Sequence, residues 1–395
     1  MHIYVLPKFK DIERMRPIVS YYNHPLKKSL NLASRALACV LKNADLDDFI
    51  LWKTQDLNNE IKKINLKLRG QHGNNTKILP FFADIKNMYT ELPHEDILKA
   101  VRFILEKCKS KTRRSNVTIE KCKQGDAIMG KSVITRTTHI CFSFKEIEDI
   151  CKFDLENIYF KSNGQILQQI RGVPMGSPCS PTLAICVCAY YEHLLTQKLK
   201  RYEFKNNTYD CTPIMGAIRY VDDLQAFIAF DKNDPESEEL AKSIIQTMHK
   251  DAYHPDMKLK AESVSGKWPY LESHLQIIST IGIADKISIT YNNKNLDSVI
   301  QDQKLKYLTL QHRESFMTKQ QSYAKIIGQL HRIDKTVTDR RNKIIAVLEF
   351  MIIAKQNGYS PKLIAQCALK VFLKTDNRIW YEISQLVENI YKLWK

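Results

Sequence analysis

Apolar residues recur at helical spacing in some segments of the chain and form short continuous runs in others, which predicts a mixture of helices and strands. Mixed apolar and basic segments near the start predict helices over residues 25–42 and 46–68. The apolar run KILPFFADI (77–85) predicts a buried strand that ends at Asp84. A further helix is predicted after Pro93, where four apolar residues recur at helical spacing: Ile97, Val101, Ile104 and Cys108.

The middle of the chain carries a basic segment, a long helix and a hairpin. Residues 107–123 hold seven Lys and Arg against one Glu and predict a solvated loop. Ser180 as N-cap and Pro181 at the first helical position predict the start of a largely buried helix. Two β-favouring runs in residues 217–230 flank Asp222-Asp223, which predicts a hairpin with two carboxylates at its tip.

The later part of the chain continues with a helix, strands and then helices. Pro235 begins a predicted helix that extends to about residue 250. Strands are predicted in MKLKAESV, YLESHLQII and KISITYN, and the pattern is helical and basic from about residue 295 onward. The whole order favours an α+β layer fold, in which a small antiparallel sheet is backed by helices.

Composition and charge narrow the class of protein. A hydrophobic content of 44% with 26% charged residues is typical of a globular chain and excludes wholesale disorder. The ten Cys contain no C-x-x-C pair, which argues against a structural zinc site and favours reduced thiols. Sixty Lys and Arg against 43 Asp and Glu give a net charge of +17, so the expected partner is nucleic acid or an anionic membrane face.

A membrane span is not expected. Residues 172–191 are twenty uncharged residues, but Pro174, Pro178 and Pro181 interrupt the first half of this run. The remainder is long enough for one buried helix, and the N-terminus has no apolar core of signal-peptide length. The sequence therefore predicts an intracellular protein without a membrane partner.

The three aspartates of the predicted sheet form a candidate metal site. Asp84 ends one strand, and Asp222 and Asp223 sit at the turn of a hairpin. Adjacent strands lie about 4.8 Å apart, so the three carboxylates can share one small volume. Such a cluster needs cations, and Mg²⁺ prefers oxygen ligands. The alternative is that Asp-Asp merely makes a turn.

Three motifs, taken together in chain order, favour the metal site over a simple turn. ADIKNMYTELPHEDIL, QIRGVPMGSPCSPTLA and RYVDDLQAFI together resemble the palm of reverse transcriptases. The segments YVLPKFKDIERMRPIVSYY, FKSNGQILQQIRGVPMGSPCSP and ITYNNKN resemble the Penelope-like element reverse transcriptases, relatives of the telomerase reverse transcriptases. The resemblance extends from about Tyr4 to at least Arg332. Many members carry a GIY-YIG endonuclease module, which we do not expect in this chain.

This resemblance implies a right-hand polymerase with fingers at 1–83, a palm at 84–285 and a basic helical thumb at 286–395. It implies an RNA-directed DNA polymerase of mobile-element origin that uses two Mg²⁺ ions, or Mn²⁺, with Asp84, Asp222 and Asp223 as catalytic metal ligands. The partners would be template–primer nucleic acid and deoxynucleoside triphosphates, in the nucleus. Two alternatives stay open: a catalytically silent nucleic-acid-binding relic, and a telomerase-like or maturase-like polymerase with a dedicated RNA.

The resemblance also implies a nucleotide-binding set. Tyr89 would be an aromatic sugar gate, with a packed sheet aromatic as the alternative. Lys258 and Lys260 are candidate proton donors to pyrophosphate, although surface lysines are common. The other implied residues are a basic set that holds the triphosphate and a loop that supports the nascent base pair: Arg16, Lys8, Lys10, Gln169, Gly172, Pro174 and Gly176. The alternative for the two N-terminal lysines is a solvated charge, and for the glycine segment a simple loop.

Contacts to the nucleic-acid backbone are implied for the later part of the chain. WPYLES resembles a primer grip, but it departs from the family pattern at Glu272 and Ser273. The basic helices from about residue 295 onward suit phosphate contacts, with a solvated helical face as the alternative. The candidate residues are Tyr270, Leu271, Arg332, Arg340, Arg341 and Lys343.

Overall fold

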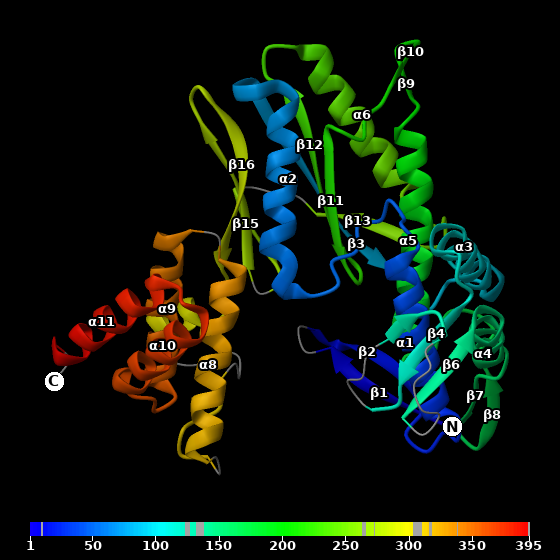
Figure 1. Cartoon of the computed structure of the whole chain (residues 1–395), viewed down its shortest axis with the longest axis horizontal. Helices are drawn as coiled ribbons and strands as arrows, with labels where there is room; N and C mark the ends of the chain where they lie inside the picture. Colours follow the sequence, from blue (N-terminus) through cyan, green and yellow to red (C-terminus); the bar gives the residue numbers. More distant parts are fainter. Residues whose placement is uncertain are drawn as a thin grey trace. The chain divides into compact units, whose positions relative to one another are not determined.

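The computed structural model describes residues 1–8, 11–122, 127–131, 138–262, 266–271, 273–302, 310–315, 318–337 and 339–393. The chain divides into two compact units. The first unit comprises Met1–Ile50, Leu79–Ile228 and Pro235–Glu262. The second unit comprises Leu51–Ile78, Ala229–Asp234 and Ser263–Lys395. Each unit combines helices with mostly antiparallel strands, as the α+β prediction requires (Figure 1).

The central sheet has the strand order β11-β12-β3-β13. Strands β11 (Met215–Tyr220) and β12 (Asp223–Asp231) form the predicted hairpin, which Tyr220 and Asp223 close as a pair. Strand β3 (Thr76–Lys86) is the predicted buried strand beside it, and β13 (Lys258–Ala261) pairs antiparallel with β3. The sheet thus places the ends of β3 and the tip of the hairpin together.

The first unit contains several long helices. They are α1 (Lys27–Asn43), α3 (His94–Thr112), α4 (Phe144–Glu156), α5 (Ser180–Leu199) and α6 (Pro235–Asp251). Helix α5 is buried on nearly all sides, which explains its apolar sequence. Its N-cap is Cys179, so the prediction for Ser180 was off by one residue. The Ser180 hydroxyl instead donates to the carbonyl of Pro174 at 2.7 Å.

Three further sheets belong to the first unit. One has the order β2-β1-β7-β8, from β1 (His2–Lys8), β2 (Asp11–Ser20), β7 (Tyr159–Ser162) and β8 (Gln165–Gln168). Another has the order β5-β4-β6, from β4 (Asn116–Glu120), β5 (Ala127–Met129) and β6 (His139–Ser143). The third pairs β9 (Tyr202–Phe204) with β10 (Asn207–Tyr209).

Two predicted elements were wrong. Residues 107–123 are not one solvated loop, because α3 continues to Thr112 and β4 follows, with buried Val117 and Ile119. The helix predicted over 46–68 is absent before residue 54. In that stretch the N–H of Phe49 donates to Glu192, and the carbonyl of Phe49 accepts a hydrogen bond from the N–H of Arg219. These tertiary hydrogen bonds replace helical ones.

The second unit begins with helices and a three-stranded sheet. A 3-10 turn (Thr54–Asp56) leads into α2 (Leu57–His72), and a second one (Gly73–Asn75) follows it. The sheet has the order β14-β15-β16, from β14 (Lys267–Tyr270), β15 (Ser273–Thr280) and β16 (Ile283–Tyr291). The single strand predicted for YLESHLQII is interrupted, because Leu271 turns the chain with a φ of 57°.

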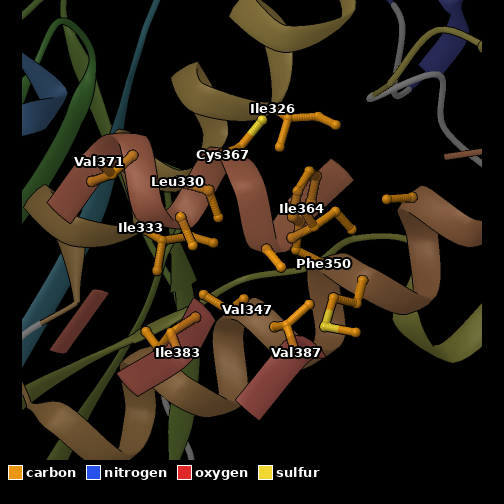
Figure 2. Close-up of a cluster of buried hydrophobic side chains, with 14 of the residues drawn as sticks. Ile326, Leu330, Ile333, Val347, Phe350, Ile364, Cys367, Val371, Ile383 and Val387 are labelled. Atoms are coloured by element: carbon orange, nitrogen blue, oxygen red, sulfur yellow. The ribbon is translucent and has the colours of Figure 1, made fainter. Parts of the chain in front are cut away.

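The end of the second unit is helical, as predicted. Its helices are α7 (Leu296–Asp302), α8 (Lys319–Thr336), α9 (Arg340–Gln356), α10 (Pro361–Thr375) and α11 (Arg378–Leu393). Side chains of Thr318, Asp339 and Ser360 cap the N-termini of α8, α9 and α10. Apolar side chains of α8 to α11, among them Leu330, Phe350 and Ile364, form one buried core (Figure 2). In the described part of the chain no helix is apolar and long enough to span a membrane.

Candidate functional site

The three predicted aspartates come together in the first unit. Asp84 lies near the end of β3, and Asp222 and Asp223 lie at the turn between β11 and β12. One carboxylate oxygen of each lies within 4.8 Å of the others. The backbone joins the two elements directly, because the N–H of Ile85 donates to the carbonyl of Asp222 at 2.8 Å. The order of β12 and β3 in the sheet therefore fixes the cluster.

The donor set suits a hard divalent cation. Three carboxylates at this separation repel one another and offer only oxygen atoms, the ligands that Mg²⁺ and Mn²⁺ take. The ammonium group of Lys86 contacts a carboxylate oxygen of Asp84, so positive charge is accommodated at this point of the cluster. The residues present thus fit a bound metal ion.

A cavity of about 760 Å³ opens beside the carboxylates. Asp84 and Asp222 line it from the sheet, and Arg16 and Gly176 line it from other parts of the first unit. Tyr89 contributes to the same wall. The structure therefore places five of the predicted site residues around one volume large enough for a nucleotide-sized ligand.

Tyr89 is held closely beside the aspartates. Its carbonyl accepts a hydrogen bond from the N–H of Val173 at 2.8 Å, which joins it to the loop that precedes α5. Burial, together with the negative charge of Asp222, raises the pKa of Tyr89 to about 12. Tyr89 is therefore a neutral phenol at physiological pH and lines the cavity with Asp84 and Asp222.

Residues 172–177 form a tightly packed loop at the cavity. Gly172 has a φ of 71°, and a Cβ there would lie 2.3 Å from the carbonyl oxygen of Tyr89. A Cβ on Gly176 would lie 2.0 Å from the carbonyl oxygen of Val19. Both positions require glycine, because no side chain fits between these backbones. The glycines thus serve close backbone packing, and Gly172 and Pro174 are not among the residues that line the cavity.

Ser177 anchors this loop from below. Its hydroxyl donates to Asp154 at 2.6 Å, and the hydroxyl of Tyr21 donates to the same carboxyl group at 3.1 Å. Burial raises the pKa of Asp154. The N–H of Val19 donates to the carbonyl of Met175 at 3.1 Å. Strand β2 and helix α4 therefore fix the loop relative to the carboxylates.

Two lysines of β13 face the same side of the sheet as Asp84. Lys260 pairs with Asp84 and Lys258 pairs with Lys86 across the β13–β3 ladder. Side chains of directly paired residues project from the same face of a sheet, and both lysines are exposed. The register thus places two cations on the face that carries the aspartate.

The remaining predicted nucleotide-binding residues differ in their positions. Lys8 ends β1, opposite the start of β2, and Lys10 lies outside the described residues. Gln169 is half-buried and does not line the cavity; its side-chain amide donates to the carbonyl of Arg171 at 2.8 Å. The structure therefore gathers Arg16, but not Gln169, at the cavity.

The candidate nucleic-acid contacts belong to the second unit. Tyr270 is buried at the end of β14, and Leu271 forms the turn after it. On α9, Arg340 pairs with Glu382, and the ammonium group of Lys343 lies 2.8 Å from Asp334. The side chain of Lys343 is only 14% exposed. Arg332 and Arg341 are exposed on their helices, so they are better placed than Lys343 to contact a ligand.

Sequence reasoning missed three charged residues near the aspartates. Lys86 contacts Asp84, and Arg219 and Glu192 form a fully buried ion pair beneath the hairpin turn. The signal was present for the last two, because Glu192 is a single acidic residue in an apolar helix and Arg219 a single charge in an apolar strand. A lone charge in a buried element requires a partner.

Comparison with known proteins identifies solved structures with a similar fold. No family profile matches the chain, and no curated protein matches its sequence. The structure of the telomerase of Candida albicans, in complex with a TWJ fragment of telomeric RNA, is similar with a TM-score of 0.52 and 14% identity. That match covers 98% of this chain and 64% of the Candida albicans chain.

Two structures of the Candida tropicalis telomerase are also similar to this chain. The apo form matches with a TM-score of 0.51 and 13% identity over 97% of this chain. The form in complex with the TWJ fragment matches with a TM-score of 0.53 and 13% identity over 99% of this chain. This chain spans 63% and 60% of those two chains. At such identities the similarity concerns the fold, and this chain therefore has a telomerase-like fold of mixed helices and sheets.

Proposed function

We propose that this protein is an RNA-directed DNA polymerase that extends a primer 3′-hydroxyl with deoxynucleoside triphosphates. The observation that carries the proposal is the cluster of Asp84, Asp222 and Asp223 beside a cavity that Tyr89 and Arg16 also line. The telomerase-like fold supports it, since the similar structures are telomerases. Fold alone does not assign function, so the proposal rests on the site.

In the proposed reaction, the primer 3′-oxygen forms a bond to the α-phosphorus as the bond to the pyrophosphate oxygen breaks. Asp84, Asp222 and Asp223 would hold Mg²⁺, or Mn²⁺, and such ions lower the pKa of a bound hydroxyl and neutralise developing charge. Arg16 would hold triphosphate oxygens through its planar guanidinium group. Lys260 would give a proton to the departing pyrophosphate, from the face of the sheet that carries Asp84.

We also propose the finer assignments that the sequence resemblance implies. Residues 1–83, 84–285 and 286–395 would act as fingers, palm and thumb, and the chain would be a Penelope-like, mobile-element-derived enzyme that works in the nucleus. Leu271, in the turn that follows the buried Tyr270, would contact the primer. The basic helices α8 and α9 would contact the phosphates of template and primer without reading their sequence.

A second candidate is a telomerase-like polymerase with a dedicated RNA partner. The similar structures favour it, because two of them are telomerases in complex with an RNA fragment. Competition binding separates the two candidates. A dedicated partner predicts that one structured RNA binds well above generic template–primer, whereas a general reverse transcriptase binds both alike.

Primer extension tests the proposal directly. The full chain is incubated with a homopolymer RNA template, a labelled primer and the complementary deoxynucleotide, with Mg²⁺ or with EDTA. We expect extension in Mg²⁺ only. A chain that binds the template–primer but does not extend it in Mg²⁺ or Mn²⁺ would be a nucleic-acid-binding relic, and the polymerase proposal would be wrong.

Replacing Arg340 and Arg341 together with Ala is expected to weaken template–primer binding for all sequences alike. Each lost contact to a duplex phosphate should reduce the slope of log affinity against log salt by about 0.9. The measurement is a salt titration of binding. Lys343→Met is the matched control, because the Lys343 side chain is only 14% exposed and pairs with Asp334, so its loss should affect thermal stability but not the slope. An unchanged slope in the double variant would place these arginines on a merely solvated face.

A further inference from the structure

Arg219 is a buried charge in an otherwise apolar strand. Its side chain and that of Glu192 on α5 are both 0% exposed. The Arg219 Nε donates to Glu192 Oε1, and Nη2 donates to Glu192 Oε2 at 3.2 Å. Removal of two charges from water is costly, and such a pair often stabilises a fold no better than apolar residues would. The pair therefore calls for a role other than stability.

The third arm of the guanidinium group points to the hairpin turn. Arg219 Nη1 donates to the carbonyl oxygen of Val221 at 2.8 Å. Val221 has a φ of 57°, in the left-handed region that β-branched residues rarely adopt. The Val221 carbonyl belongs to the peptide group that leads into Asp222. This hydrogen bond therefore holds the backbone immediately before a candidate metal ligand. An unusual backbone conformation of this kind persists only where its surroundings hold it.

Glu192 has further hydrogen-bond partners of its own. The hydroxyl of Tyr253 donates to Glu192 Oε1 at 2.7 Å, and the N–H of Phe49 donates to Glu192 Oε2 at 3.0 Å. The N–H of Arg219 donates to the carbonyl of Phe49. On the other side of the turn, the Asp222 carbonyl is bound by the N–H of Ile85. The turn is thus held from α5 on one side and from β3 on the other.

We propose that Arg219 is a positioning residue for the metal site. Through the Val221 carbonyl it holds Asp222 and Asp223 at the separation from Asp84 that a shared cation requires, and Glu192 holds Arg219 in turn. This role rests on the proposed polymerase function. Groups that orient metal ligands typically change metal affinity or activity by about 10- to 100-fold when they are lost.

The test compares Arg219→Lys with Tyr253→Phe. A lysine can pair with Glu192 but cannot also donate to Val221 with a fork. Tyr253→Phe removes a hydrogen bond to the same Glu192 and spares the contact to Val221. Binding of Mn²⁺ alone is measured from the loss of the free-ion EPR signal. The binding that is lost in Asp222→Asn is the part that occurs at the three aspartates. The second readout is the Mg²⁺ concentration at half-maximal primer extension, and the third is the melting temperature.

For Arg219→Lys we expect Mn²⁺ affinity about tenfold lower and the Mg²⁺ requirement raised by a similar factor, with template–primer affinity unchanged. Tyr253→Phe should lower the melting temperature without either change. If Arg219→Lys does not fold, the double variant Arg219→Met with Glu192→Met replaces it, because apolar residues of similar volume commonly maintain a fold at a buried ion pair. It should show the same loss of Mn²⁺ affinity.

Two results would overturn parts of this account separately. Wild-type Mn²⁺ affinity in a folded Arg219 variant, with active wild-type enzyme, would remove the positioning role and leave the polymerase proposal intact. Equal Mn²⁺ binding by wild type and Asp222→Asn, without extension by either, would remove the metal site itself and with it the proposed function.

Discussion

Asp222→Asn is expected to reduce primer extension to below about one per cent of the wild-type rate, because groups that act in the transition state normally contribute orders of magnitude. Asparagine has the same shape as aspartate but lacks the charge that a divalent cation needs. Template–primer affinity should stay within a few-fold of wild type, since the basic surfaces are unchanged. Single-turnover extension and a binding titration on the same preparation measure the two quantities.

Asp251→Asn is a suitable control for this substitution. Asp251 ends α6 and pairs with Lys198 at 2.6 Å, with both side chains partly exposed. Exposed pairs of this kind contribute little to stability, so the variant should extend primers like wild type. Extension by Asp222→Asn above about one per cent of wild type would contradict the assignment of the aspartates as metal ligands.

Tyr89→Ala is expected to raise the use of ribonucleotides relative to deoxynucleotides by at least about tenfold, which corresponds to about 1.4 kcal/mol of lost discrimination. Tyr89 lines the cavity beside Asp84 and Asp222, and Val173 fixes its backbone. A ring held in this way can exclude a 2′-hydroxyl by steric overlap, and a smaller side chain relieves that overlap. Single-nucleotide extension with competing ribo- and deoxynucleotides on one template measures the ratio.

Tyr89→Phe separates the ring from its hydroxyl. The ring stays in place and the neutral phenol is lost, so the selectivity should change little. An equal fall in both rates for Tyr89→Ala, with an unchanged ratio, would make Tyr89 a packing residue and would place the sugar gate elsewhere.

Local pattern predicted the elements that carry the aspartates. Strand β3, the β11–β12 hairpin and helix α6 follow from short-range spacing and turn residues, and they appear where the sequence places them. Residues 46–53 were predicted as the start of a helix over 46–68 and are not helical. These residues have helical pattern, but the backbone of Phe49 bonds to α5 and β11, and no local pattern reveals such long-range contacts.

The candidate site was predictable to the same extent. Asp84, Asp222, Tyr89 and Gly176 lie in motifs, and the structure places them around one cavity. The Glu192–Arg219 pair joins residues far apart in the chain, so its contact with the Val221 carbonyl follows only from the packing of α5 below β11. Lys343 illustrates the reverse: its charge suggested a phosphate contact, and the fold uses that charge to pair with Asp334.

The measurement that tests the central claim most directly is extension of one labelled primer on matched RNA and DNA templates by the full chain and by Asp222→Asn. We predict Mg²⁺-dependent incorporation of deoxynucleotides by the wild-type chain on the RNA template, and none by the variant although it binds the same template–primer. Binding without extension by the wild-type chain, or equal extension by both proteins, would contradict the account.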